Sequence, residues 1–173
     1  MKILICDDEY ANMEMLKKHI SEYIAAHCIK ADIYDTSSPK DIFENSTSYD
    51  LAFLDIQMPD IDGISVAKEL KSRNQKVVIF FVTAFDEYQD EAMDLHAFRF
   101  FEKPFDPQRL YASLDKAMQY IDETYIDLFL YNSGNRSGVN TNILLDVFNM
   151  FIFSTKLRIK ILLSSLKVFR NTA

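Results

Sequence analysis

The most informative segment of the sequence is Leu51-Ala52-Phe53-Leu54-Asp55-Ile56-Gln57-Met58-Pro59-Asp60-Ile61-Asp62-Gly63. Four apolar residues lead directly into Asp55, and Pro59 and Gly63 then indicate a turn. A continuous apolar run bounded by turn residues predicts a strand buried on both faces of a parallel sheet. Open parallel sheets bind ligands at the carboxyl ends of their strands, so we expect Asp55 at a functional site. For this stretch alone, the alternative is that Asp55 only caps the turn.

The residues on either side of this stretch repeat the strand-then-helix pattern. Apolar runs predict strands over residues 3–6, 31–34, 51–54, 77–82 and 98–101. Helical spacing of apolar residues predicts helices over 10–27, after Pro39, from Gly63, over 86–95 and from Pro107. Repeated strand–helix units with right-handed crossovers predict an α/β fold, a five-stranded doubly wound parallel sheet with helices on both faces.

Composition limits the classes of protein to consider. The 173 residues include three glycines, four prolines and two cysteines, which is typical of a globular chain without a disulfide framework. The first strand begins too early for a signal peptide, and no window is apolar enough for a membrane span, so we expect a cytoplasmic protein. The net charge of −7 divides into −11 over residues 1–124 and +4 over 125–173. This division suggests two segments with different partners.

Polar residues follow four of the predicted strands. Asp7 and Asp8 follow the first strand, Asp55 the third, Thr83 ends the fourth, and Lys103 follows the fifth. The first and third strands are neighbours in a doubly wound sheet, so three carboxylates should converge. Carboxylates this close repel one another unless a cation lies among them, and Mg²⁺ is the usual cation at such oxygen sites. A carboxylate beside the metal can attack phosphorus, while a hydroxyl and an ammonium group contact the phosphoryl oxygens.

These residues and motifs resemble the response-regulator receiver domain of two-component signalling. The matching motifs are Asp7-Asp8, the stretch from Leu54 to Gly63, Thr83-Ala84 and Lys103-Pro104-Phe105, and the resemblance covers residues 2 to about 122. It implies a flavodoxin-like strand order of 2-1-3-4-5, the order that is typical of this family. It also implies a phosphoacceptor rather than an enzyme acting on a separate substrate, with a sensor histidine kinase as partner.

The same resemblance assigns roles to individual residues. Asp55 would be the phosphoacceptor, and Thr83 and Lys103 would contact the phosphoryl group. Mg²⁺ would be held by Asp8, Asp55 and the main-chain carbonyl of Gln57, with Asp7 nearby.

The resemblance implies two further features, a switch aromatic at Phe100 and a dimer interface. The family's switch aromatic stands three residues before the lysine and rotates when the threonine moves. In this sequence Phe100 occupies that position and lacks the hydroxyl of the commoner tyrosine. Its alternative role is that of an ordinary core aromatic. A homodimer through the face of the fourth helix, fifth strand and fifth helix is also expected.

Residues 123–173 form a tail that we separate from the receiver at residues 1–122. Residues 126–131 have a strand-like pattern and 132–135 a polar turn, which resembles the start of a LytTR-type DNA-binding domain. That resemblance implies transcription regulation, but the remaining length and pattern indicate a truncated or frame-shifted domain. Residues 156–161 alternate basic and apolar side chains, which suits contact with DNA phosphates or an edge strand protected by lysines.

Two alternatives to a DNA-binding regulator remain. One is a receiver that acts only by protein–protein contact, with a non-functional output segment. The other is a phosphohydrolase with an aspartate nucleophile, but such enzymes usually carry a second acid two residues later, where this chain has Gln57.

Overall fold

The computed structural model describes residues 1–84, 90 and 94–134, with side chains as far as Tyr125. Its strands are β1 (Lys2–Cys6), β2 (Asp32–Thr36), β3 (Leu51–Leu54), β4 (Val78–Thr83) and β5 (Arg99–Glu102). Its helices are α1 (Tyr10–Ala26), α2 (Lys40–Glu44), α3 (Gly63–Arg73) and α5 (Pro107–Gly134). The predicted helix over 86–95 lies mostly outside the described residues.

The strands form one parallel five-stranded sheet in the order β2-β1-β3-β4-β5. This order confirms the predicted topology. The middle of the sheet is buried on both faces, because every residue of β3 and β4 is buried. The continuous apolar runs of these two strands therefore reflect helices packed above and below them.

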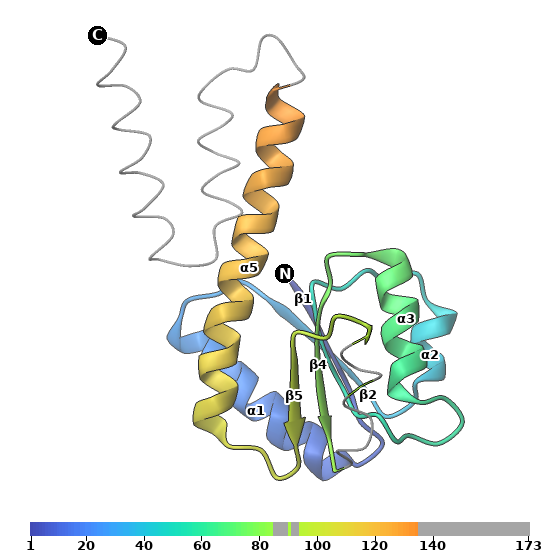
Figure 1. Ribbon diagram of the computed structural model, residues 1–173. Coiled ribbons are helices and arrows are strands. Elements are labelled where there is room, and N and C mark those ends of the chain that lie inside the picture. The colour runs from blue at the N-terminus through green and yellow to red at the C-terminus, as the bar shows by residue number, and fades with distance from the viewer. Residues whose placement is uncertain (85–89, 91–93, 135–173) are drawn as a thin grey trace, which may run out of the picture.

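Two hydrophobic cores lie on opposite faces of the sheet. In Figure 1, α1 and α5 cover one face, and α2 and α3 cover the other. Alternate residues of a strand point to opposite faces. Phe53 and Phe80 therefore stack in the α1/α5 core, with ring centroids 4.9 Å apart. Their neighbours Leu54 and Phe81 lie in the core beneath α2 and α3.

Helix α5 is longer than the sequence predicted. The apolar residues that recur along this helix at helical spacing are buried: Leu110, Leu114, Ala117, Met118 and Ile121. The prediction that residues 126–131 form a strand is wrong, because the helix continues to Gly134. Ile126, Phe129 and Leu130 also fit helical spacing, and no glycine or proline intervenes before Gly134. A short apolar run does not by itself distinguish the two structures.

The extended helix also affects the other predictions about the tail. It crosses the domain boundary predicted after residue 122, and the rest of the tail, 135–173, lies outside the described residues. Among the helices that the structure describes, none has the length and apolar character that crossing a membrane requires.

Candidate functional site

Main-chain hydrogen bonds continue past the strand ends and align the predicted site residues. The Asp55 N–H donates to the Cys6 carbonyl at 2.9 Å, which holds Asp55 against the end of β1. The Lys103 N–H donates to the Thr83 carbonyl at 2.8 Å, which holds Lys103 against the end of β4. Both residues therefore lie at the carboxyl edge of the sheet, on backbone that is fixed by the neighbouring strand.

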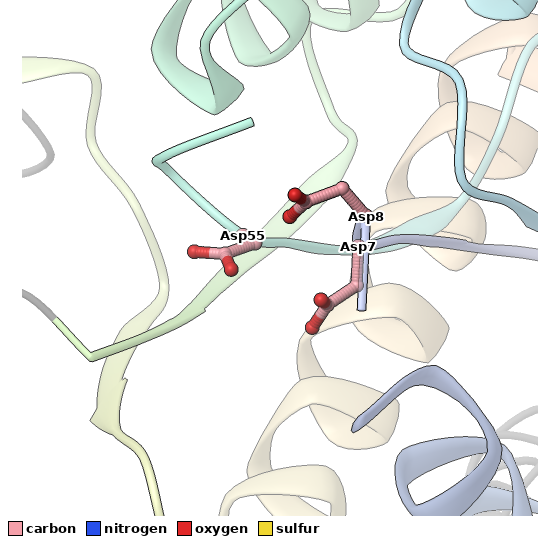
Figure 2. A group of neighbouring side chains, drawn as sticks. All are labelled: Asp7, Asp8 and Asp55. Atoms are coloured by element: carbon pink, nitrogen blue, oxygen red, sulfur yellow. The ribbon is translucent and has the colours of Figure 1, made fainter. Parts of the chain in front are cut away.

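Three carboxylates come together at this edge. One oxygen each from Asp7, Asp8 and Asp55 lies within 4.8 Å of the others. Figure 2 shows these side chains projecting from the ends of β1 and β3. Asp7 and Asp55 are buried, with 3% and 7% of their surface exposed, whereas Asp8 is exposed. Solvent can therefore reach the cluster at Asp8, whereas Asp7 and Asp55 form its buried side.

Lys103 connects two of the three carboxylates. Its Nζ lies 2.6 Å from Oδ2 of Asp55 and 2.8 Å from Oδ2 of Asp7, and its side chain is 11% exposed. Burial alone would lower the pKa of Lys103, but the hydrogen bonds to Asp55 and Asp7 outweigh it and raise that pKa. Lys103 is therefore a fixed positive charge at the site.

The environment of Asp7 disfavours its charged form. Burial raises its pKa above the ordinary value, and the hydrogen bonds from Lys103 and from the Glu9 N–H offset this only in part. The Glu9 N–H lies 3.0 Å from Oδ1 of Asp7. Sequence reasoning missed this role of Glu9, and an Asx-turn pattern after Asp7 is the signal that could have indicated it.

The cluster fits a hard divalent cation. Oδ1 of Asp55 is buried and has no hydrogen-bond partner, which is costly unless something else satisfies it. The neighbouring carboxylates of Asp7 and Asp8 supply further oxygens of the kind that Mg²⁺ binds. The donor set is all oxygen, and one Lys103 ammonium offsets only part of its charge.

The loop after Asp55 packs tightly against the strand that precedes it. The Gly63 N–H donates to the Ile56 carbonyl at 2.9 Å. A Cβ at Gly63 would lie 1.9 Å from the Asp55 carbonyl oxygen, so only glycine fits there. Asp62 caps α3, accepting from the Ser65 N–H at 2.7 Å. The main chain at Gly63 therefore approaches the main chain of Asp55 itself.

The other three predicted site residues, Thr83, Gln57 and Phe100, differ in how deeply they are buried. Thr83 is fully buried at the end of β4. Gln57 is exposed just after β3 and borders a hollow of about 400 Å³ beside α3. Phe100 is half-buried and packs against the core beneath α2 and α3. The structure therefore brings Asp7, Asp8, Asp55 and Lys103 into direct proximity, whereas Phe100 packs against an apolar core.

Comparison with known proteins gives a family match. The model of the response regulator receiver domain matches residues 3–115. The chain is 32% identical to the sensory transduction protein LytT of Bacillus anthracis over 117 residues, covering 67% of this chain and 46% of LytT. It is 30% identical to the transcriptional regulatory protein YpdB of Escherichia coli K12 over 116 residues, covering 67% of this chain and 47% of YpdB. The chain thus spans less than half the length of these curated relatives.

A solved structure gives the same result. The response regulator TrrA of Thermotoga maritima, in complex with Mg²⁺-BeF, is 28% identical and has a TM-score of 0.57. The match covers 67% of this chain and 97% of TrrA. The match to the family model covers more than half of the chain, and the fold agrees with it. The chain therefore belongs to the response regulator receiver domain family.

Proposed function

We propose that this receiver accepts a phosphoryl group on Asp55 from a sensor histidine kinase. One observation carries the proposal: Asp55 has a buried, unpartnered carboxylate oxygen beside two further aspartates and a lysine ammonium. A carboxylate in this setting is a nucleophile toward phosphorus once its charge and that of its neighbours are balanced. The chain itself is then a phosphoacceptor rather than an enzyme with a separate substrate.

Transfer of the phosphoryl group forms one bond, at Asp55, and breaks one bond, at the phosphorylated histidine of the kinase. An oxygen of Asp55 forms a bond to phosphorus, and the bond from phosphorus to the donor's imidazole nitrogen breaks, leaving its electron pair on nitrogen. The Lys103 ammonium, now 2.6 Å from Asp55, stabilises the added negative charge of the acyl phosphate. The Thr83 hydroxyl, at the end of β4, contacts the phosphoryl oxygens. Phe100 responds to the movement of Thr83 through packing, because it has no hydroxyl.

Mg²⁺ is the cation that we propose for the acidic cluster. Asp8, Asp55 and the main-chain carbonyl of Gln57 would hold it, with Asp7 nearby. When bound, it neutralises charge on the carboxylates and on the phosphoryl oxygens during transfer. The solved complex of TrrA with Mg²⁺-BeF supports this assignment by family.

The names of the relatives favour the control of transcription as the response to phosphorylation. YpdB is named a transcriptional regulatory protein and LytT a sensory transduction protein, and both are about twice as long as the matching region. We propose transcription control through DNA contacts made after the receiver, with homodimers formed through the face that includes β5 and α5. The second candidate is signalling by protein contact alone. It is supported because residues 126–131, whose pattern resembled the start of a LytTR-type domain, are helical and belong to α5. Phosphorylation-dependent gel shifts with the full chain would separate the two.

Phosphorylation with acetyl phosphate tests the central proposal. Wild-type protein should take up acid-labile label only with Mg²⁺, and Asp55→Asn should abolish it. Asp32→Asn is the matched control, since it removes an exposed aspartate of β2. Label that persists on Asp55→Asn, in a protein with an unchanged circular dichroism spectrum, would show that the phosphoacceptor is another residue.

A further inference from the structure

At the edge of the sheet opposite the acidic cluster, Asp50 and Tyr125 join two distant parts of the chain. The Tyr125 hydroxyl, from α5, donates a hydrogen bond to Oδ1 of Asp50, which directly precedes β3. The two residues are 75 positions apart in the sequence. Tyr125 lies beyond the end of the family match at residue 115, so the family match does not cover this contact.

Asp50 is a rigid anchor because both neighbouring strands hold its main chain. Its N–H donates to the Lys2 carbonyl at 2.9 Å, and its carbonyl accepts from the Val78 N–H at 3.0 Å. Its second carboxylate oxygen, Oδ2, accepts from the Lys2 N–H at 2.7 Å. The carboxylate that Tyr125 contacts therefore has little freedom to follow a moving helix.

Tyr125 is suited to the other half of the contact. It is half-buried and packs against the α1/α5 core. Burial and the hydrogen bond to Asp50 raise the pKa of its phenol, so the hydroxyl keeps its proton and remains a donor. A cleft of about 120 Å³ lies beside the pair, lined in part by Asn74, Lys76 and Thr124.

The contact lies where α5 leaves the rest of the receiver. We call residues 126–134, the turns of α5 after Tyr125, the α5 extension. Nine helical residues span roughly 13 Å. Figure 1 shows these turns, in orange, projecting past the other described elements. The direction of the extension therefore depends on what holds its root.

We propose that Asp50 and Tyr125 form a latch that fixes the α5 extension to the sheet and sets the direction in which the chain leaves the receiver. Further toward the start of α5, Asp115 accepts from the Tyr23 hydroxyl of α1 at 2.8 Å. The latch adds a second fixed point, on the sheet rather than on α1. Two fixed points on different elements define the axis of a helix, so whatever follows residue 134 is presented on a rigid arm.

Hydrogen exchange on the full chain tests the latch. In Tyr125→Phe the ring is kept and only the hydroxyl is lost. Amide exchange in residues 126–134 should rise by about tenfold relative to wild type, the effect expected from one hydrogen bond to a charged acceptor. Tyr120→Phe is the control, because it removes an exposed phenol from the same helix and should leave exchange in this segment unchanged. Asp50→Asn keeps an acceptor oxygen but loses the charge, and should give a smaller rise.

Two results would overturn the proposal. One is exchange in residues 126–134 that is the same in Tyr125→Phe, Tyr120→Phe and wild type. The other is an equal rise throughout β1, β4 and the extension, which would make the contact a general stabilising bond rather than a latch. Uptake of label on Asp55 is measured in the same samples. It should be unchanged, so failure of the latch and failure of the phosphorylation proposal can be distinguished.

Discussion

The ammonium nitrogen of Lys103 lies 2.6 Å from Oδ2 of Asp55. The proposed phosphoacceptor is thus paired with the lysine that we propose to stabilise the phosphoryl group. The same nitrogen contacts Asp7, so one positive charge serves two buried carboxylates. The three carboxylates of the site carry more negative charge than Lys103 offsets. This excess determines how substitutions should change stability and Mg²⁺ binding.

Removing Lys103 should destabilise the metal-free protein. Lys103→Met keeps most of the side-chain volume but leaves Asp7 and Asp55 as buried charges without their counter-ion. We expect a loss of about 3 kcal/mol in the free energy of unfolding, typical of breaking a buried ion pair from one side. Mg²⁺ should restore part of the loss because it replaces the missing positive charge. Urea unfolding with and without Mg²⁺ measures both effects, and an unchanged midpoint without Mg²⁺ would contradict the pairing.

The raised pKa of Asp7 predicts a dependence of stability on pH. A carboxyl whose pKa is raised by folding binds its proton more tightly in the folded state. Its contribution therefore falls as the pH rises through the window between its ordinary value, 3.8, and the raised folded value. In metal-free protein, the stability of the wild type relative to Asp7→Asn should increase as the pH is lowered through this window. Urea unfolding at several pH values checks the sign, and the opposite slope would mean that Lys103, not burial, controls Asp7.

Gly63→Ala should disturb Asp55 without changing any charge. The new Cβ would meet the Asp55 carbonyl oxygen, which belongs to the main chain and cannot simply rotate away. Overpacking of this kind costs about 1–3 kcal/mol. We also expect slower phosphorylation, since the loop must shift next to the phosphoacceptor. Lys68→Ala, an exposed change on the same helix, is the control for unfolding and labelling. Equal rates in both variants would show that the loop does not position Asp55.

The sequence correctly predicted those parts of the fold whose residue pattern is compatible with only one kind of secondary structure. The buried runs at β3 and β4 predicted a parallel sheet, and the acidic residues at the strand ends predicted the carboxylate cluster. The strand order came from the resemblance to the receiver family. The end of α5 was predicted wrongly because a short apolar run around Ile126 fits a strand and a helix equally well. Only tertiary contacts decide such cases, and here the bond from Tyr125 to Asp50 lies just before the ambiguous residues.

The convergence of the three carboxylates was predicted, but the individual contacts of Lys103 with them were not. The bridge from Lys103 to Asp7 depends on the distances between strand ends, which the register of the whole sheet sets. Residue types at strand ends indicated that an acidic site exists. They did not indicate that Asp7 is buried while Asp8 is exposed, a difference that separates their expected roles.

Asp8 should matter for the cation more than for the fold. It is the exposed member of the cluster and lies on its open side, so its loss leaves the buried pair of Asp7 and Asp55 with Lys103 intact. Asp8→Asn should weaken Mg²⁺ binding by about tenfold, because one of few anionic ligands is lost. Relief of carboxylate repulsion should at the same time make the metal-free protein slightly more stable.

Calorimetric titration with Mg²⁺ and urea unfolding without it measure the two effects of Asp8→Asn separately. Asp32→Asn, on β2, changes the net charge equally and should leave the Mg²⁺ affinity close to that of wild type. Equal affinities in Asp8→Asn and wild type would remove Asp8 from the metal site. The cation would then have to bind through Asp55 and main-chain oxygens, with Asp7 nearby. An unchanged free energy of unfolding in metal-free Asp8→Asn would show that Asp8 does not repel the other two carboxylates.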